Sequence, residues 1–210
     1  MADWATISAL ATAGGTLALA GVTLASVRSA NRVARVAERS LLAGLRPVLM
    51  QSRPDDPQQK VHFADGKLLV VGGAGAACEA SPEAVYLAMA LRNVGSGIAV
   101  LHGWHFYPER RSSDQEPVPL EDFQLLSRDL YVAPGDIGFW QGAFRDPAAD
   151  RFSGAAAAIA ARETVCVDVL YGDHEGGQRA ITRFALWPRQ DGAYTAAVVR
   201  HWNVDRPDPR

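Results

Sequence analysis

The stretch VYLAMALRNVGSGIAVLHGWHFYPE, residues 85–109, decides the fold. Large apolar residues occupy every second position from Val85 to Leu91, as in a β-strand with one buried face. The segment NVGSG (93–97) is made of turn residues, and IAVLHGWHFYPE (98–109) is again rich in apolar and aromatic residues. The stretch therefore predicts a strand, a short turn and a second strand.

Similar short segments lie on both sides of this pair, with turn residues such as Asp65-Gly66 and Pro134-Gly135 inside them. They are PVLMQ (47–51), VHFADGKLLVV (61–71), LYVAPGDIGFWQGAF (130–144), TVCVDVLYGD (164–173), RAITRFALWPR (179–189) and AYTAAVVRHWN (193–203). Closely spaced short strands indicate an antiparallel sheet rather than alternating β and α units, and we predict about eight of them. GGAGAAC (72–78) is predicted to be a flexible loop.

One helix is expected within this β region, in AADRFSGAAAAIAARE (148–163), and a short helical turn in LEDF (120–123). The helix would be an insertion between strands that packs over an open edge or end of the sheet. The predicted fold class is mainly β, an antiparallel β-sandwich of immunoglobulin-like architecture over residues 47–203. A polar tail follows at 204–210.

The segment before the β region, WATISALATAGGTLALAGVTLASVRSANRVARVAERS (4–40), has no charged residue between Asp3 and Arg28. At about 1.5 Å per residue, a helix of this uncharged length exceeds the hydrocarbon core of about 30 Å. We predict a transmembrane helix over about residues 4–27, continuing as a basic juxtamembrane helix within an N-terminal segment 1–46. A cleaved signal peptide is disfavoured, because positive charge follows the apolar run instead of preceding it.

The first basic residues of the chain all lie just beyond the apolar run. They are Arg28, Arg32, Arg35, Arg39 and Arg46. The positive-inside rule then places the N-terminus outside and the following domain in the cytoplasm, with the chain in the cell membrane. The first four arginines share one helical face, which suits anionic lipid headgroups at about 1 kcal/mol per residue. The alternative is that they only set the topology.

Small residues recur at helical spacing along the predicted span. They are Ala11, Gly14, Gly15, Ala18, Gly21 and Ala25. Such a stripe permits the close approach of a second helix, and therefore self-association of the chain. The alternative is the ordinary composition of an alanine-rich helix.

The charge is unevenly distributed along the chain. Residues 1–46 hold five arginines and two carboxylates and therefore have a net charge of +3. Because the whole chain has a net charge of −2, residues 47–210 have a net charge of −5. An acidic domain argues against nucleic acid as a partner. Cys78 and Cys166 are too few for a disulfide framework, and we expect Cys166 to be a small buried apolar residue.

The densest group of reactive side chains lies in YGDHEGGQR (171–179). Its candidate binding loop consists of Asp173, His174, Glu175, Gly176 and Gly177. The carboxylates and imidazole could bind a cation, or His174 could act as a general base in hydrolysis. The alternative is a polar hairpin loop whose aspartate bonds its own backbone. No GxSxG, HExxH or phosphate-loop motif accompanies the group, so no catalytic residue, metal or cofactor is predicted.

Two further groups of side chains allow both a functional and a structural interpretation. His102 and His105 point to opposite faces of a regular strand, and we expect His102 on the core face with Trp104 and Phe106. The domain is also rich in aromatic residues: Trp104, Phe106, Phe139, Trp140, Trp187 and Trp202. We expect most of these rings in the core, with a ligand surface as the alternative.

Several segments of the chain are similar to those of known proteins. They are ASVRSANR, SLLAGLRPVL, LRNVGSGIAVLHGW, GFWQGAFRD, LYGDHEGGQRAITRF and VVRHWNVDRPDPR. Through them the chain resembles a family of uncharacterised bacterial single-pass membrane-anchored proteins of unknown function. The resemblance implies an anchor followed by a domain, and it implies no activity, cofactor or site residue.

The sequence thus favours a membrane-tethered, non-enzymatic interaction or sensing module at the cytoplasmic face. Its expected partners are the lipid bilayer, another protein and further copies of the chain, and its expected contact loops are NVGSG, APGD (133–136) and DHEGG (173–177). One alternative is a membrane-anchored hydrolase or metal-dependent enzyme that uses Asp173, His174 and Glu175. Another is an extracytoplasmic ligand-binding domain with reversed topology, in which Cys78 and Cys166 pair.

Overall fold

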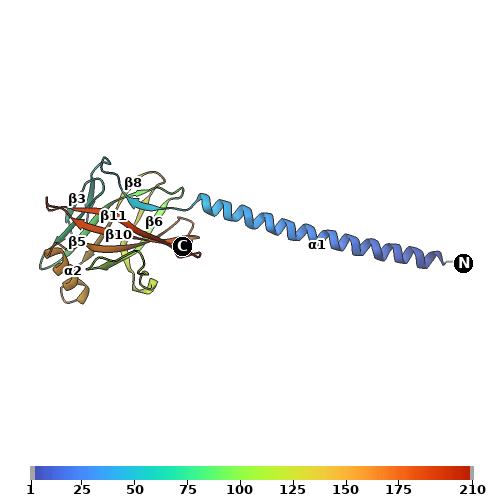
Figure 1. The fold of residues 1–210 in the computed structure, drawn as a ribbon. Coiled ribbons are helices and arrows are strands. Elements are labelled where there is room, and N and C mark those ends of the chain that lie inside the picture. Colours follow the sequence, from blue (N-terminus) through green and yellow to red (C-terminus); the bar gives the residue numbers. More distant parts are fainter. Residues whose placement is uncertain (1–2, 209–210) are drawn as a thin grey trace. The chain divides into compact units, whose positions relative to one another are not determined.

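The computed structural model describes residues 3–208, with the side chains of residues 5, 6 and 43 excepted. The chain divides into two compact units, Met1–Ala43 and Gly44–Arg210. The first unit consists almost entirely of one helix, and the second is mainly β (Figure 1).

The N-terminal helix α1 spans Trp4–Gly44 without interruption. Its segment Ile7–Leu42 is long and apolar enough to cross a membrane, with a mean hydropathy of 1.6 in its most apolar window. The hydroxyls of Thr12 and Thr23 donate to carbonyls one turn earlier, at 2.9 and 2.8 Å. These bonds lower the cost of placing a hydroxyl in lipid, and α1 therefore has both the length and the internal bonding of a membrane span.

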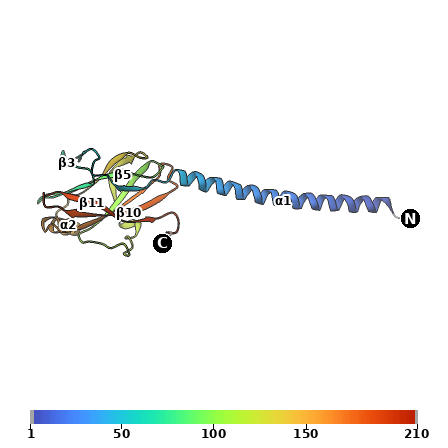
Figure 2. The same ribbon diagram turned by 45° about the horizontal axis from the view of Figure 1, so that its top comes forward.

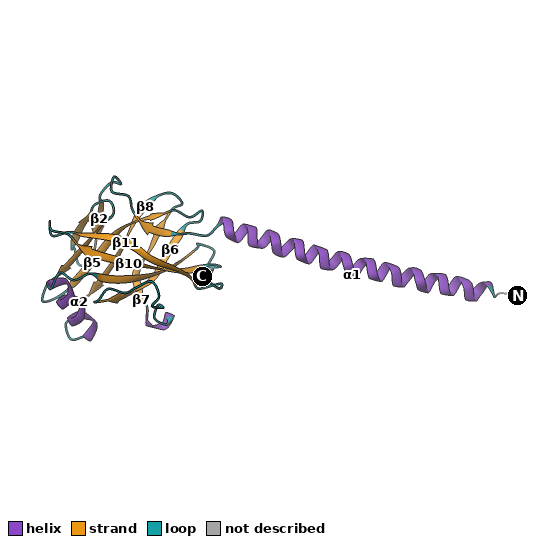
Figure 3. Ribbon diagram, in the orientation of Figure 1, coloured by secondary structure: helices purple, strands orange, loops and turns teal. Residues whose placement is uncertain are grey.

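The β unit contains eleven strands in its described part. They are β1 (Leu49–Gln51), β2 (Gln59–His62), β3 (Leu68–Val71), β4 (Gly75–Ala80), β5 (Val85–Asn93), β6 (Ala99–Tyr107), β7 (Gln124–Val132), β8 (Ile137–Phe144), β9 (Val165–Gly172), β10 (Arg179–Pro188) and β11 (Tyr194–Asn203). Nine form one antiparallel sheet in the order β1-β5-β4-β11-β10-β9-β6-β7, with β8 on the other side of β5 (Figure 3). β2 and β3 form a separate hairpin.

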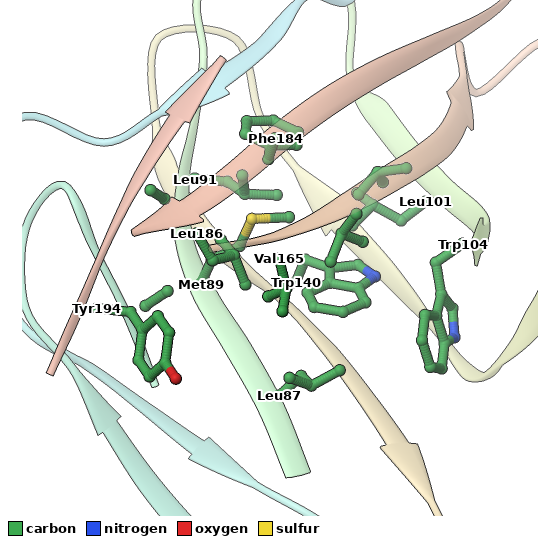
Figure 4. Close-up of a cluster of buried hydrophobic side chains, with 14 of the residues drawn as sticks. Leu87, Met89, Leu91, Leu101, Trp104, Trp140, Val165, Phe184, Leu186 and Tyr194 are labelled. Carbon is green, nitrogen blue, oxygen red and sulfur yellow. The ribbon is translucent and has the colours of Figure 1, made fainter. Parts of the chain in front are cut away.

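The nine-stranded sheet curls around one apolar core, to which residues of both its halves contribute (Figure 4). Trp140 of β8 and Met89 of β5 lie in the same cluster as Phe184 of β10, and all three are fully buried. This arrangement confirms the predicted mainly β fold with a preceding long helix. The two layers of the predicted sandwich are continuous, because they are halves of the same curled sheet.

The inserted helix α2, Asp150–Ala160, closes one end of the curled sheet and lies at the same end of the β unit in two views (Figure 1, Figure 2). It contributes Phe152, Ala155 and Ile159 to the main core. A 3₁₀ turn, η1, occupies Leu120–Asp122, where the sequence predicts a helical turn. Both helical predictions are confirmed.

The outer faces of the sheet are also covered, which a half-buried strand pattern does not predict. The β2–β3 hairpin packs Val61 and Leu69 onto Ala88 and Ala90 of β5. Every residue of β9 is buried, because the segment between β6 and β7 lies over its outer face, where Val118 packs against buried residues of β9 and β10. Small side chains on β5 leave room for the hairpin, so that strand is buried on both faces.

The prediction of a flexible loop at residues 72–78 is wrong for residues 75–78, because β4 begins at Gly75 and pairs with both β5 and β11. Glycine and alanine carry no strand signal of their own, and the pairing partners determine the strand. Cys78 of β4 packs against the main core, whereas Cys166 lies on the outer face of β9 with Tyr107 and Ala185. Both thiols are free, and the sheet separates them, so the alternative of a Cys78–Cys166 disulfide does not fit this fold.

Candidate functional site

The predicted binding loop forms the turn between β9 and β10. Asp173 is only 2% exposed, and its Oδ1 accepts a hydrogen bond of 2.9 Å from the Gly177 backbone N–H. Gly176 has a φ of +75°, which glycine adopts without strain. His174 and Glu175 are exposed, with Nε2 and Oε1 3.2 Å apart. The buried carboxylate thus bonds its own turn, and the two exposed side chains lie outside that turn.

Of the two strand histidines, His105 lies on the face opposite to Trp104, as predicted, and His102 does not lie as predicted. β6 changes register against β9 between Leu101 and Gly103, which places a β-bulge at His102. Leu101 and Trp104 therefore both enter the core, and the expected core-facing position of His102 is wrong. His105 Nδ1 lies 3.2 Å from the Asp122 carbonyl oxygen. Among residues 3–208, no three or more His, Cys, Asp and Glu side chains form a group that could hold a metal ion.

The predicted contact loop NVGSG instead holds the segment that follows α1. Asn93 is fully buried, and its Oδ1 accepts a hydrogen bond of 3.2 Å from the Val48 N–H. The Ser96 N–H donates to the Arg46 carbonyl oxygen at 3.0 Å. A Cβ on Gly97 would lie 1.7 Å from the Leu45 carbonyl oxygen, so only glycine permits this approach. We call this contact of residues 45–48 with residues 93–97 the clasp.

The end of β1 nearest the clasp is also bonded inside the core. The Leu49 N–H donates to the Tyr171 hydroxyl at 3.1 Å. That hydroxyl lies 3.0 Å from Thr182 Oγ1 and 3.2 Å from His201 Nδ1. The predicted contact loop APGD is likewise bonded to β5, because the Gly135 N–H donates to the Asn93 carbonyl oxygen at 2.8 Å. All three predicted contact loops therefore use backbone groups for bonds within the domain.

The candidate positions on α1 are exposed on the isolated helix. This holds for the basic residues Arg28, Arg32, Arg35 and Arg39 and for the small residues Ala11, Gly14, Gly15, Ala18 and Gly21. No described side chain forms an ion pair with the four arginines. Nothing lies within 4 Å of a Cβ built on Gly14, Gly15 or Gly21, so this face leaves space for a second helix.

The aromatic residues are divided between the core and the surface. Trp104, Trp140 and Trp202 are at most 5% exposed, as the core interpretation predicts. Trp187 is 41% exposed, with the guanidinium of Arg110 5.0 Å from its ring centre. Most of the indole rings therefore build the fold rather than a surface.

An ion pair between β9 and β10 was not expected from the sequence. Arg183 donates to both carboxylate oxygens of Asp168, at 2.7 and 2.8 Å, and both side chains are fully buried. The Tyr107 hydroxyl also donates to Asp168, at 3.0 Å, and burial together with this carboxylate raises the pKa of Tyr107 to about 12. Arg183 further donates to the Ser112 and Gln115 carbonyl oxygens, so the network is structural and holds the segment over β9 in place.

A second unexpected feature is the seam between β7 and β8, the two ends of the curled sheet. Within the described residues, β7 pairs only with β6 and β8 only with β5. Arg128 of β7 crosses the seam, donating to Gln141 Oε1 of β8 at 2.9 Å and to the His62 carbonyl oxygen at 3.3 Å. The neighbouring strands therefore meet through side chains in place of a backbone ladder.

The seam widens into a groove of about 210 Å³. Its lining includes Gln124, Leu125 and Ser127 of β7 and Gln141 and Ala143 of β8. Gln124 also lines an adjoining, mostly apolar pocket of about 110 Å³. The walls of that pocket include Phe106, Phe144, Asp150 and Ala155. The groove and the pocket are thus adjacent parts of one surface feature.

One side of the groove carries a charged cluster. Arg145, which lines the groove, donates from Nε to Asp65 Oδ2 at 2.8 Å, and the Tyr86 hydroxyl donates to the same oxygen at 2.7 Å. These two bonds lower the pKa of Asp65 to about 2. Arg128, in contrast, bonds only neutral acceptors in the described part of the chain. Its charge is therefore not balanced by a carboxylate.

The comparisons with known proteins add no relative. No family model matches the chain, and no curated protein matches it. The candidate features are therefore inferred from the geometry alone. They are the apolar helix α1, the clasp at the residues that follow it in the chain, and the seam between β7 and β8.

Proposed function

We propose that this protein is a membrane-tethered, non-enzymatic interaction module. α1 serves as a single-pass anchor, and the β domain binds a protein partner at the cytoplasmic face of the membrane. Anchoring confines the domain to the bilayer and raises its effective concentration toward partners there.

The observation that carries this proposal is the character of α1. The segment Ile7–Leu42 is long enough to cross a membrane, and none of its most apolar window is buried within the protein. Exposed large side chains such as Leu10, Leu17 and Leu24 lie along it. Apolar surface of this extent is stable in lipid and unfavourable in water, which supports the assignment of a membrane span.

The orientation follows from the charges next to the span. The four arginines from Arg28 to Arg39 lie on the domain side of the apolar run and have no carboxylate partner in the described structure. They would be retained on the cytoplasmic side and bind anionic headgroups there. The domain that follows would then be cytoplasmic.

Two experiments on the full chain test this proposal. Membranes from expressing cells are washed with carbonate, and protease is then added to intact and to permeabilised spheroplasts. The chain should stay in the pellet, and the domain should be cut only after permeabilisation. Recovery of the chain in the wash would overturn the anchor, and cleavage in intact spheroplasts would overturn the orientation and favour an extracytoplasmic ligand-binding domain.

A variant pair makes the orientation test sharper. Changing Arg28, Arg32, Arg35 and Arg39 together to alanine should mix the two orientations, because the charge bias is lost. Changing Arg189 and Arg206, which lie in the β unit, to alanine is the control and should leave the orientation unchanged. An unchanged protease pattern in the fourfold variant would contradict the proposed role of these arginines.

A further inference from the structure

The two strands that border the seam offer unused backbone groups. An edge strand carries a row of N–H and C=O groups with no partner on its outer side. Here two edges, those of β7 and β8, face each other across a groove of about 210 Å³. A strand lying in this groove could pair with an edge of the sheet, which is the mode by which many domains bind extended peptides.

The side chains of β7 favour such an added strand. Near the two ends of β7, exposed residues such as Leu125 and Tyr131 alternate with less exposed ones, whereas Ser127, Arg128 and Asp129 in its middle are all exposed. Leu125 is 82% exposed although it is a large apolar residue at the groove. Covering this side chain with a ligand would remove it from water, which contributes to binding.

The adjoining pocket is suited to one apolar side chain. Its volume of about 110 Å³ approaches that of cavities of about 150 Å³ that bind benzene. Phe106, Phe144 and Ala155 provide apolar walls. Because Gln124 lines both spaces, a ligand in the groove can place a side chain in the pocket.

The charges give the ligand a direction. Arg128 has no carboxylate partner in the described residues, whereas the mostly apolar pocket has both Asp150 and Arg151 in its lining. An acidic residue of the ligand is therefore favoured at Arg128, and an apolar residue at the pocket. The part of β7 between Gln124 and Arg128 is irregular, because Leu125 and Leu130 pair with Gly103 and Leu101, which are only two residues apart on β6. The ligand should therefore carry both an apolar and an acidic residue, at a spacing that the selected peptides will reveal.

We propose that the seam between β7 and β8 binds an extended peptide segment of a partner protein. The segment adds to the sheet as a strand, places an apolar side chain in the pocket lined by Phe106 and Phe144, and pairs a carboxylate with Arg128. This deepens the proposed function, because it gives the interaction module a binding site and a class of partner.

Peptide selection on the full chain tests the proposal. The probe is a random twelve-residue peptide library displayed on phage, depleted on empty nanodiscs and then selected on the chain in nanodiscs. The enriched peptides should carry both an apolar residue and an Asp or Glu, at a spacing shared among them. Absence of enrichment over empty nanodiscs, or enrichment of amphipathic helical patterns, would overturn the proposal.

Charge reversal locates the binding site. Arg128→Glu should weaken binding of the enriched peptides at least about tenfold and should restore it when their acidic residue is replaced by lysine. Arg206→Glu, an exposed arginine in the tail, is the matched control and should change nothing. Equal binding by the Arg128→Glu variant and the unmodified chain would place the peptide elsewhere.

Hydrogen exchange reports on strand addition itself. Bound peptide should slow amide exchange within residues 124–132 and 137–144, because edge N–H groups gain hydrogen bonds. Binding without protection there would contradict strand addition. These outcomes are separate from those of membrane fractionation, because the selection can also be made on the chain in solution if it proves not to be anchored.

Discussion

Arg183 and Asp168 form a bidentate ion pair in which both side chains are fully buried between β10 and the segment that covers β9. Removing one partner leaves the other charge buried without compensation, which typically costs 3–5 kcal/mol. We expect Asp168→Ala to lower the free energy of unfolding by about this amount, measured by urea titration of the full chain in micelles. Replacing both residues with leucine should cost less than Asp168→Ala alone, and a greater loss in the double variant would contradict this reasoning.

The close approach at the clasp predicts a strong effect of one added methyl group. Gly97→Ala would place a Cβ 1.7 Å from the Leu45 carbonyl oxygen, so the backbone must move. We expect a loss of about 2 kcal/mol or more in unfolding free energy, in the upper range of single substitutions. Gly72→Ala is the control, because nothing lies within 4 Å of its added Cβ. Equal stability of the two variants would show that residues 45–48 are loosely held.

Both cysteines should be unreactive in the folded chain. Burial raises the pKa of the Cys78 thiol and that of Cys166, which lowers the fraction of reactive thiolate. A maleimide should therefore label neither residue until denaturant is added, as read by mass spectrometry. Ser127→Cys, at an exposed position beside the seam, should label rapidly and serves as the positive control. Rapid labelling of Cys166 would indicate that the covering segment opens.

The Asp65 cluster predicts a stability change in acid. Its folded-state pKa is about 2, below the usual 3.8, so the unfolded chain binds more protons between these values. The stabilisation is therefore present above about pH 4 and is lost as the pH falls toward 2. Asp65→Asn should destabilise the chain at pH 6 and make little difference at pH 2. Asp55→Asn, at an exposed position, is the control, and equal destabilisation by the two substitutions at pH 6 would contradict this reasoning.

Self-association through the span predicts a position-specific effect. Changing Gly14 and Gly15 together to isoleucine fills the small-residue face and should weaken association several-fold, measured by energy transfer between labelled copies in vesicles. Ala13→Ile and Ala20→Ile, which lie on the opposite side of the helix, form the control pair. A result in which the control pair weakens association equally would indicate non-specific crowding of the helices.

The sequence predicts well those features that depend on local periodicity. The alternation from Val85 to Leu91 indicates β5, and the charge-free run after Asp3 indicates the long apolar helix. The sequence does not predict features that depend on pairing between strands. β4 carries almost no pattern because it is built of glycine and alanine, and the bulge at His102 reverses the alternation without any mark in the composition.

The same limit applies to the candidate sites. Asp168 and Arg183 stand in apolar strands, which is a visible signal, but their pairing requires the register of β9 against β10. The seam is even more difficult to predict from the sequence. It exists because the described residues of β7 and β8, although neighbours, do not pair through backbone hydrogen bonds. In contrast, the turn at Asp173 can be predicted from its own residues, because the Asp173 carboxylate accepts a hydrogen bond from the backbone N–H of Gly177, only four residues later.

The clasp also determines how the domain would respond to mechanical tension on its tether. Tension applied at residue 45 is opposed by the hydrogen bond from the Val48 N–H to Asn93 Oδ1. The backbone bonds of residues 46 and 48 with residues 96 and 94 oppose it as well. Arg46 is in turn paired with Asp205 at 2.6 Å, which joins the beginning of the β unit to its tail. Several bonds must therefore yield together before β1 peels from β5, and the domain should withstand force at its attachment point better than a three-residue strand would alone.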